Sequence, residues 1–248
     1  MRALLSRLSI PALLVTLVVV AICLRLSAWQ LERAEEKRQW ISDQQERSTE
    51  PPRSLEQLLA MDDPQHYAAG ISGSVDNART VLLDNRMLNG IAGYYLLTPL
   101  HTEQGHWVLV NRGWIARGPD RNQLPDIPPL PEQIQVDGMA YRAAENRFML
   151  ADAPLPDNQW PLRVQSVDFD AIGEKLGVEL APFEIRVAEH WQAKDETPLP
   201  RPWKLDSRMG PDQHKAYALQ WFVLAIAALL VFVAATVHNA RRHHQEDA

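Results

Sequence analysis

The sequence predicts an α+β membrane protein, in which two transmembrane helices flank a mainly antiparallel β domain with a few short helices. Uncharged apolar runs lie near both ends, 17 residues over 8–24 and 22 residues over 216–237. As a helix, the longer run would measure about 33 Å at ~1.5 Å per residue, enough to cross a bilayer core. Between them lie short runs of β-branched and aromatic residues, separated by Gly, Asn and Pro. That middle segment is long enough for one domain with a core.

The composition excludes several classes of protein. Of the 248 residues only Cys23 is a cysteine, so the chain forms no internal disulfide and has no CxxC pair for a metal or redox site. The formal net charge is -6 and the basic residues are scattered, so no basic surface for nucleic acid is indicated. The chain also lacks the GxGxxG, GxxxxGK[ST], HExxH and GxSxG patterns. Sequence motifs therefore give no case for a Rossmann, P-loop, zincin or α/β-hydrolase site.

The first apolar run predicts a retained transmembrane helix over residues 8–28. A signal-peptide cut after Ala28 would place Leu26 at the −3 position, where a small residue is usual. Arg25 lies near the outer end, where its side chain can reach the headgroups, and Trp29 lies where interfacial aromatic residues gather. The segment before the span is too short for an organelle transit peptide, which favours a bacterial membrane.

The second apolar run predicts a transmembrane helix over residues 214–238, with a tail over 239–248. Two spans place both ends of the chain on one side of the membrane and the domain over 30–213 on the other. Basic residues in the short ends mark that side as cytoplasmic; they are Arg2, Arg7, Arg241 and Arg242. We therefore expect a multi-pass protein of the bacterial inner (plasma) membrane, with cytoplasmic termini and a periplasmic domain.

Three helical segments are predicted between the spans. Residues 29–47 alternate charged and apolar side chains and predict a helix that continues out of the membrane. Ser54 is a typical N-cap for a short helix over 55–60. A third helix is predicted over 168–176, with Gly177 as its C-cap.

Strands are predicted from β-branched and aromatic enrichment at residues 67–75, 80–84, 94–100, 107–114, 134–142 and 182–188. Their close spacing favours antiparallel pairing. Residues 85–86 read as a turn after the second strand, and residues 105–106 as a hairpin turn. The Pro-rich residues 119–131 predict a loop, and residues 198–202 predict an extended linker to the second span.

The start of the second span carries a candidate ligand-binding face. At about 100° per residue, one helix face carries an imidazole, aromatic side chains and small residues; they are His214, Tyr217, Ala218, Trp221 and Ala225. Small residues let another helix approach, and a neutral imidazole beside aromatic surface can ligate a porphyrin iron. The alternative is an interfacial aromatic belt with an interfacial histidine, and spacing alone favours that alternative.

A second group of residues ends a predicted strand. Asn111, Arg112, Gly113 and Trp114 combine a turn, a fork of guanidinium donors and a large aromatic ring. This set predicts a surface that binds a carboxylate group or the peptide backbone of a partner. Alternatively, Arg112 braces the turn by hydrogen-bonding to carbonyl groups, and the isolated motif favours that role.

Several short segments, each present once, follow one another in a particular order along nearly the whole chain. They are Trp29-Gln30 with Arg33, Gly93-Tyr94 with Thr98-Pro99, residues 110–114, the block Gly138, Arg142, Glu145, Phe148, Asn158 and Trp160, and the set His214, Tyr217, Trp221 and Phe222. With a span at each end, this order resembles the surfeit-locus protein-one family, membrane proteins that assist assembly of haem-copper cytochrome c oxidase. Two positions depart from the family: Ser27 stands where Gly is usual, and Lys215 where an apolar residue is common.

The resemblance implies an assembly factor, not an enzyme, that assists insertion of haem a into oxidase subunit one. It implies haem a as the bound cofactor, with His214 as a ligand of the haem iron and Tyr217 and Trp221 beside it. Its implied partners are subunit one and the lipid bilayer, with haem a synthase as a further candidate. Lys215 would lie near a haem propionate, and Asn111, Arg112 and Trp114 are the candidate partner-binding residues.

Two other functions remain open at this point. The first is a cofactor-free membrane partner that docks on a nascent oxidase subunit and stabilises it. The second is a hydrolase in the middle domain, for which acid-base residues are available at no diagnostic spacing; they are Asp84, His101, His106, Glu145 and His190.

Overall fold

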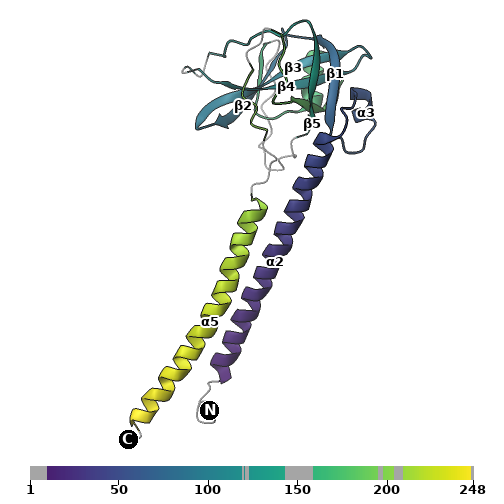
Figure 1. Cartoon of the computed structure of the whole chain (residues 1–248). Coiled ribbons are helices and arrows are strands. Elements are labelled where there is room, and N and C mark those ends of the chain that lie inside the picture. The colour runs from purple at the N-terminus through teal and green to yellow at the C-terminus, as the bar shows by residue number, and fades with distance from the viewer. Residues whose placement is uncertain are drawn as a thin grey trace. The chain divides into compact units, whose positions relative to one another are not determined.

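The computed structural model describes residues 10–118, 120, 123–142, 159–194, 198–203 and 209–246 (Figure 1). The chain divides into two compact units, Gln44–Lys204 and the pair of segments Met1–Asp43 and Leu205–Ala248. Several residues used in the sequence analysis lie outside the described residues; they are Arg2, Arg7, Glu145, Phe148 and Asn158.

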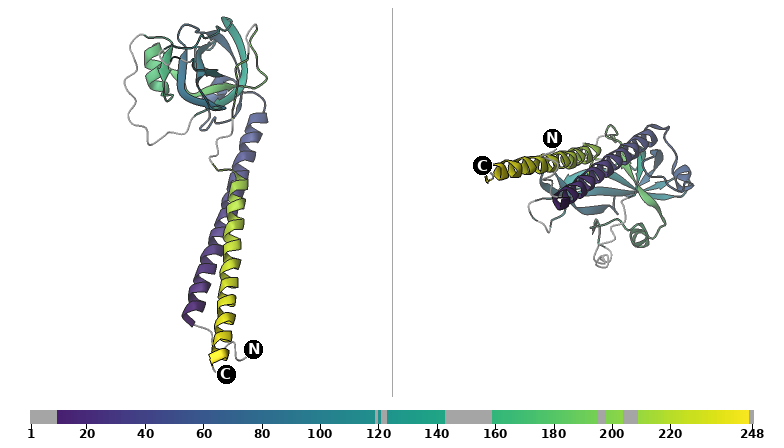
Figure 2. Two further views of the ribbon diagram at one scale, coloured as in Figure 1. Left: turned by 90° about the vertical axis from the view of Figure 1, so that its left-hand side faces the viewer. Right: turned by 90° about the horizontal axis from the view of Figure 1, so that it is seen from below.

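The second of these units contains the long helix α5 over Pro211–Glu246 and, up to Asp43, the long helix α2 over Ile10–Thr49. Among the described residues, these two helices are long and apolar enough to cross a membrane. Only 11% of the most apolar window of each helix is buried, whereas a core helix of a soluble protein would be mostly buried. Their exposed apolar side chains therefore fit a lipid environment. The two helices lie side by side in opposite directions (Figures 1 and 2).

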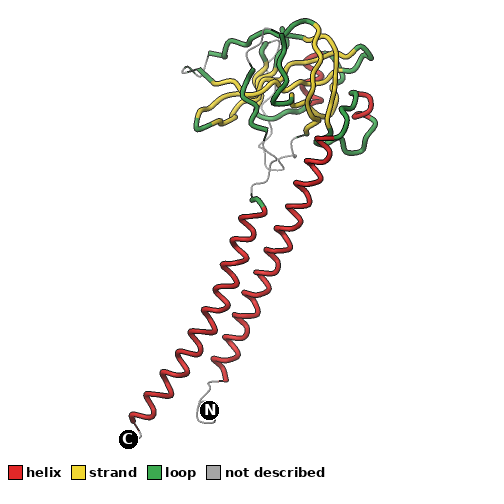
Figure 3. The backbone as a smooth tube through the Cα atoms, in the orientation of Figure 1, coloured by secondary structure: helices red, strands yellow, loops and turns green. Residues whose placement is uncertain are grey.

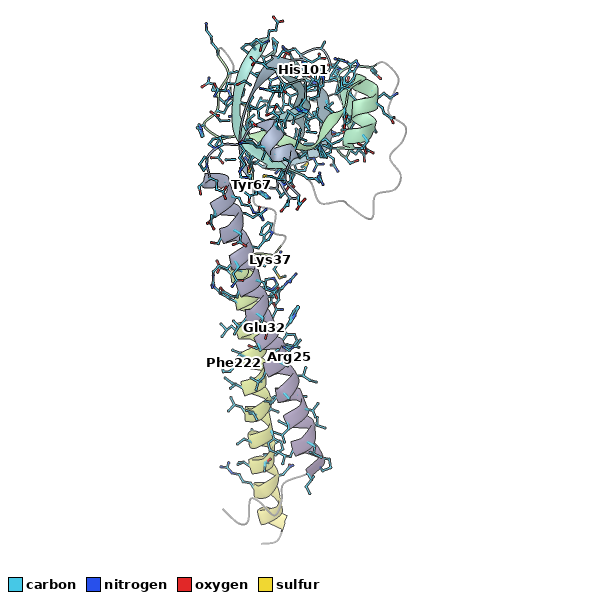
Figure 4. The ribbon with its side chains drawn as sticks, turned by 90° about the vertical axis from the view of Figure 1, so that its right-hand side faces the viewer. Arg25, Glu32, Lys37, Tyr67, His101 and Phe222 are labelled. Atoms are coloured by element: carbon cyan, nitrogen blue, oxygen red, sulfur yellow. The ribbon has the colours of Figure 1, made fainter. Side chains whose placement is uncertain are left out.

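The helix α2 continues beyond its apolar run as a charged helix, as the sequence predicted (Figures 3 and 4). Arg25, Glu32 and Lys37 lie along it, and Arg33 donates to Glu36 over 2.6 Å. Pairs at this spacing stabilise an exposed helix modestly. The prediction that the helix of the first span continues over residues 29–47 is confirmed.

Small residues are buried on both long helices; they are Cys23, Ser27 and Ala34 on α2 and Ala218 and Ala225 on α5. The Ser27 hydroxyl donates to the Ala218 carbonyl over 2.9 Å. A hydroxyl that bonds to a main-chain oxygen in the next helix needs a close approach, which small side chains permit. Ser27, which departs from the usual family Gly, thus contributes a bond that Gly lacks.

The described part of the β domain contains one seven-stranded sheet in the order β1-β5-β7-β4-β3-β2-β6. Its strands are β1 Ala68–Val75, β2 Val81–Leu88, β3 Ile91–Thr102, β4 Trp107–Ala116, β5 Gln133–Tyr141, β6 Leu162–Val164 and β7 Leu180–Val187. An additional pairing of β1 with β3 closes β1, β5, β7, β4 and β3 into a hydrogen-bonded ring (Figure 2). Ring closure leaves these strands without an open edge along the closed part.

Antiparallel pairing predominates in the sheet, as predicted, with two exceptions. The β2–β6 and β4–β7 pairs are parallel. A parallel pair needs a long crossover connection, and β6 and β7 both follow such connections. Antiparallel pairing, which we inferred from the close spacing of the strands, is therefore wrong for these two pairs. The strand β6 has three residues, which is too short to give a sequence pattern.

The two short helices in the β domain lie where the sequence predicted them, with Ser54 and Gly177 as the predicted caps. Ser54 precedes α3 over Leu55–Leu59 and accepts from the backbone N–H of Gln57, whose side chain reaches back to complete a capping box. Asp168 caps α4 over Phe169–Leu176. Gly177 ends α4 in the left-handed conformation with φ of 73°.

One predicted turn is wrong. Residues 85–86 were expected to end the second strand, but β2 continues to Leu88. Asn85 has a φ of 60° inside the strand, where the register with β3 shifts, so this position is a β-bulge. The β2–β3 turn lies instead at Asn89 and Gly90, both with positive φ. The hairpin turn predicted around Gly105, which has a φ of 90°, is confirmed.

Two main clusters of buried side chains hold the β domain together. The larger joins α3 to the sheet through Leu55 and Leu58, with Phe183 and Val187 of β7 among its members. The smaller packs Ile172 and other residues of α4 against β2, β3 and β4. Burial of these apolar side chains is the main favourable contribution to folding of the domain.

We predict that Leu58→Ala lowers the free energy of unfolding of the β domain by about 2–5 kcal/mol, because burial is lost and a cavity remains. Leu58 is fully buried in the larger cluster. Chemical unfolding of the full-length protein in detergent, followed by tryptophan fluorescence, measures the change. Ile91→Ala, at an exposed side chain, is the control and should stay within about 0.5 kcal/mol of wild type. Equal losses in both variants would contradict this packing.

Candidate functional site

The start of α5 places His214 in a defined position. Pro211 is the first helical residue, where its missing N–H costs nothing. The backbone N–H of Gly210 donates to the Gln213 side chain over 3.1 Å, and Asp212 places a negative charge in the first turn. The backbone N–H of His214 then donates to the Gly210 carbonyl over 3.3 Å. These contacts fix where the helix begins.

The His214 side chain faces α2. It is 7% exposed, and its Nδ1 lies 2.7 Å from Oε1 of Gln30. An amide oxygen can only accept, so this pairing fits the imidazole tautomer that has its hydrogen on Nδ1 and its lone pair on Nε2. Nε2 makes no hydrogen bond to any residue in the described part of the chain.

The other residues of the predicted face divide into two groups. His214, Ala218 and Ala225 are buried, and Trp221 is partly buried. Tyr217 is 43% exposed, because it lies about 100° around the helix from Ala218. The buried part of this face therefore consists of the imidazole and two alanines, with the partly buried indole beside them and the exposed Tyr217 ring at its edge.

The side chains of Asn111 and Arg112 lie inside the β domain, each with no exposed surface. Asn111 donates from Nδ2 to Glu184 over 3.1 Å and accepts from the backbone N–H of Gly113. Arg112 donates to the Pro128 carbonyl over 2.8 Å. These contacts favour the bracing role that the sequence left open, because a partner-binding surface needs exposed side chains. The partner-binding role of these residues stays a prediction.

Trp114 joins three neighbouring strands. Its ring nitrogen donates to the Arg86 carbonyl of β2 over 2.8 Å, so the side chain crosses β3. It crosses at Gly93, where an added Cβ would lie 2.5 Å from the indole ring and 2.3 Å from the Ile115 carbonyl. Gly93 is therefore required for Trp114 to reach the bulge in β2.

The Pro-rich segment that precedes α5 is attached to β4. The backbone N–H of Trp114 donates to the Pro200 carbonyl over 2.7 Å, and Gly113, with a φ of 132°, lies against the same carbonyl. Arg201 is 7% exposed and donates to the Arg112 carbonyl over 3.0 Å. The segment was predicted as a linker; it is extended, but these bonds hold it to the domain.

A polar and aromatic cluster lies beside this attachment and was missed by the sequence analysis. Glu184 is 4% exposed and accepts from Arg186 over 2.9 Å, and the Arg186 guanidinium covers the rings of Tyr141 and Trp203. Burial raises the pKa of the nearby Tyr95 phenol, whose ring lies 5.4 Å from Trp203. The sequence does contain one indication of this cluster. Glu184 and Arg186 are two residues apart in a predicted strand, so their side chains share one face.

The acid-base residues considered for a hydrolase do not form a metal-binding group in the described part of the chain, where no three His, Cys, Asp or Glu side chains gather in that way. His101 instead stacks on Trp107, with ring centroids 4.6 Å apart. His190 is exposed in the loop after β7. Glu145 lies outside the described residues.

Together, the fold and the site define a class of protein with two helices able to span a membrane, one at each end, and a β domain between them. The model of the SURF1 family matches residues 17–226, and the chain belongs to this family, whose members are known as cytochrome oxidase assembly factors. The match includes both Gln30 and His214.

Curated relatives cover most of this chain. A SURF1-like protein of Rickettsia felis is 28% identical over 226 residues, covering 89% of this chain and 94% of that protein. A SURF1-like protein of Rickettsia conorii is 26% identical and covers 87% of each chain. A SURF1-like protein of Dictyostelium discoideum is 24% identical over 246 residues, covering 84% of this chain and 89% of its own length.

We predict that Gly113→Ala detaches the segment 198–203 from β4, because an added Cβ would lie 2.7 Å from the Pro200 carbonyl and the φ of 132° disfavours any side chain. Limited proteolysis with chymotrypsin should then cleave after Trp203 at least several-fold faster. Gly118→Ala is the matched control, since an added Cβ there meets nothing within 4 Å. Equal cleavage rates in the two variants would contradict the attachment.

A pH dependence follows from His66. Burial, then the charges of Arg186 and Arg47, lower the pKa of His66 below its ordinary value near 6.5. The unfolded chain therefore binds a proton at a higher pH than the folded chain does, and stability is lost as the pH falls below about 6.5. His66→Asn, which tolerates the φ of 67°, should flatten this acid loss in thermal unfolding. The exposed His190→Asn is the control; a flattening in His190→Asn alone would contradict the assignment.

Proposed function

We propose that this protein assists insertion of haem a into subunit one of haem-copper cytochrome c oxidase, and that His214 ligates the haem iron while the cargo is held. Membership of the SURF1 family supports the assembly role. The hydrogen bond from His214 Nδ1 to Gln30 is the single observation that carries the ligand assignment. It leaves Nε2, the nitrogen with the lone pair, to the cargo.

The donor set fits a haem. Imidazole nitrogen is a usual axial ligand of haem iron, and a metal-bound histidine generally donates its other N–H to an oxygen acceptor. His214 has that acceptor in Gln30. The partly buried indole of Trp221 and the exposed ring of Tyr217 supply aromatic surface for the porphyrin along the same helix. Haem supplies the iron and the apolar macrocycle, and this chain binds and orients them.

Lys215 is a candidate contact for a haem propionate. Its ammonium lies 3.4 Å from the Asp212 carboxylate, and both side chains are well exposed. An exposed pair of this kind contributes little stability, so the ammonium can exchange its partner for a propionate at small cost. Lys215 follows the proposed iron ligand directly in the sequence.

The proposed location is the bacterial inner membrane, with both termini in the cytoplasm and the β domain in the periplasm. The basic residues of the short ends support this orientation under the positive-inside rule; they include Arg241 in the last turns of α5. His214 would then lie at the periplasmic end of its span. The proposed partners are oxidase subunit one and haem a synthase.

The test is co-expression of this protein with the enzymes of haem a synthesis, followed by purification and absorption spectroscopy. We predict a haem spectrum in the wild type that falls at least tenfold in His214→Ala. His238→Ala, which removes an exposed imidazole from the other end of α5, is the matched control and should keep its haem. An unchanged spectrum in His214→Ala would remove the ligand assignment. Absence of haem from the wild type, with the oxidase still co-purifying, would favour the cofactor-free docking partner instead.

A further inference from the structure

We propose that Gln30, on the first span, is the positioning residue of His214. Its side-chain amide oxygen holds the imidazole with the hydrogen on Nδ1, so that Nε2 keeps its lone pair for a metal-bearing ligand. The identity of that ligand rests on the proposed function, but the arrangement of the ring does not. The first span thus supplies part of the site, in addition to anchoring the chain.

The geometry of the pair is that of a strong hydrogen bond. His214 Nδ1 and Gln30 Oε1 are 2.7 Å apart and lie 184 residues apart in the chain. The distance is at the short end of the range for N–H···O bonds. His214 is 7% exposed, so water competes weakly for Nδ1 and the acceptor has a large influence on which nitrogen carries the hydrogen.

A second contact fixes the register of the two helices beside this pair. Ser27 lies one turn before Gln30, and Ala218 lies one turn after His214, with a 2.9 Å hydrogen bond between them. In an antiparallel helix pair these positions are successive contacts on the facing sides. Ala218 is almost completely buried, and its small side chain permits the close approach that the bond from Ser27 requires. The two bonds together restrict rotation of either helix about its axis.

The chemistry of glutamine suits this position. A carboxylate would add a charge at the membrane edge, which is costly unless it is paired. A neutral amide gives an oxygen acceptor without that charge. An aliphatic residue would leave the Nδ1–H without a partner, and the neutral ring would then be free to move its hydrogen to Nε2. That change would remove the lone pair from the nitrogen that faces away from Gln30.

The direct test needs no haem. Full-length protein with ¹⁵N-labelled histidine is placed in lipid nanodiscs at about pH 8, where a histidine of ordinary pKa is neutral. Long-range ¹H–¹⁵N NMR spectra report which ring nitrogen carries the hydrogen, and the signals of His214 are those missing in His214→Ala. We predict the Nδ1–H form in the wild type and a shift toward the Nε2–H form in Gln30→Leu.

Two further variants serve as controls for this test. Gln30→Glu preserves an oxygen acceptor and should preserve the Nδ1–H form, which separates positioning from general damage to the helix pair. Gln220→Leu, at an exposed glutamine of α5, should leave the His214 signals unchanged. An Nε2–H form in the wild type, or an Nδ1–H form that persists in Gln30→Leu, would overturn the proposal.

A second measurement uses the haem-loaded protein. Loss of an acceptor beside a metal-bound histidine typically weakens metal affinity 10–100-fold. Gln30→Leu should therefore release haem about 10–100-fold faster than wild type in a transfer assay to an acceptor haem protein, whereas Gln30→Glu should stay near wild type. If the purified wild type contained no haem, that result would contradict the proposed function. The NMR measurement of the His214 tautomer would still decide whether Gln30 positions the ring. Haem loss in His214→Ala, with an unchanged tautomer and release rate in Gln30→Leu, would overturn only the role of Gln30.

Discussion

The hydrogen bond between His214 and Gln30 is the interaction on which the account of the site depends. Two facing helices, whose sequences lie near opposite ends of the chain, bring the ring and the amide within 2.7 Å. Without α2, His214 would be one more histidine at the start of an apolar helix. With α2 beside it, the ring is buried, one nitrogen is occupied and the other is available. The bond from Ser27 to Ala218 supports this arrangement one turn away.

In the β domain, close packing depends on glycine residues, because the absence of a side chain leaves room for a neighbouring group. Trp114 crosses Gly93 to bond to β2, and Gly113 lets the segment 198–203 approach β4. Arg201 then fastens that segment to carbonyl groups of the domain. The short motif around Arg112 is thus explained by packing and bracing, while the site proposed for haem lies in the helical unit.

Local signals in the sequence predicted most of the elements. Capping residues such as Ser54 and Gly177 act within one turn, so a few neighbouring residues determine their role. The ring closure of β1 with β3 and the parallel β4–β7 pair depend on contacts distant in the sequence, which no local pattern records. Arginine is usually exposed, so nothing in the sequence announced that Arg112 is fully buried. Periodicity placed His214 on a face of the second span, but only the structure shows that Gln30 occupies the opposite side.

Disulfide trapping between the two spans in native membranes tests directly whether Ser27 of α2 faces Ala218 of α5. With Cys23→Ser as background, the pair Ser27→Cys and Ala218→Cys is oxidised mildly, and linked peptides are detected by mass spectrometry. Because the Ser27 hydroxyl reaches the Ala218 carbonyl and a disulfide needs neighbouring Cβ atoms, we predict efficient linkage for that pair and little for Ser27→Cys with Leu219→Cys, whose side chain is 63% exposed. Linkage to position 219 in preference to 218 would show that the helices meet through another face, and that His214 does not face Gln30.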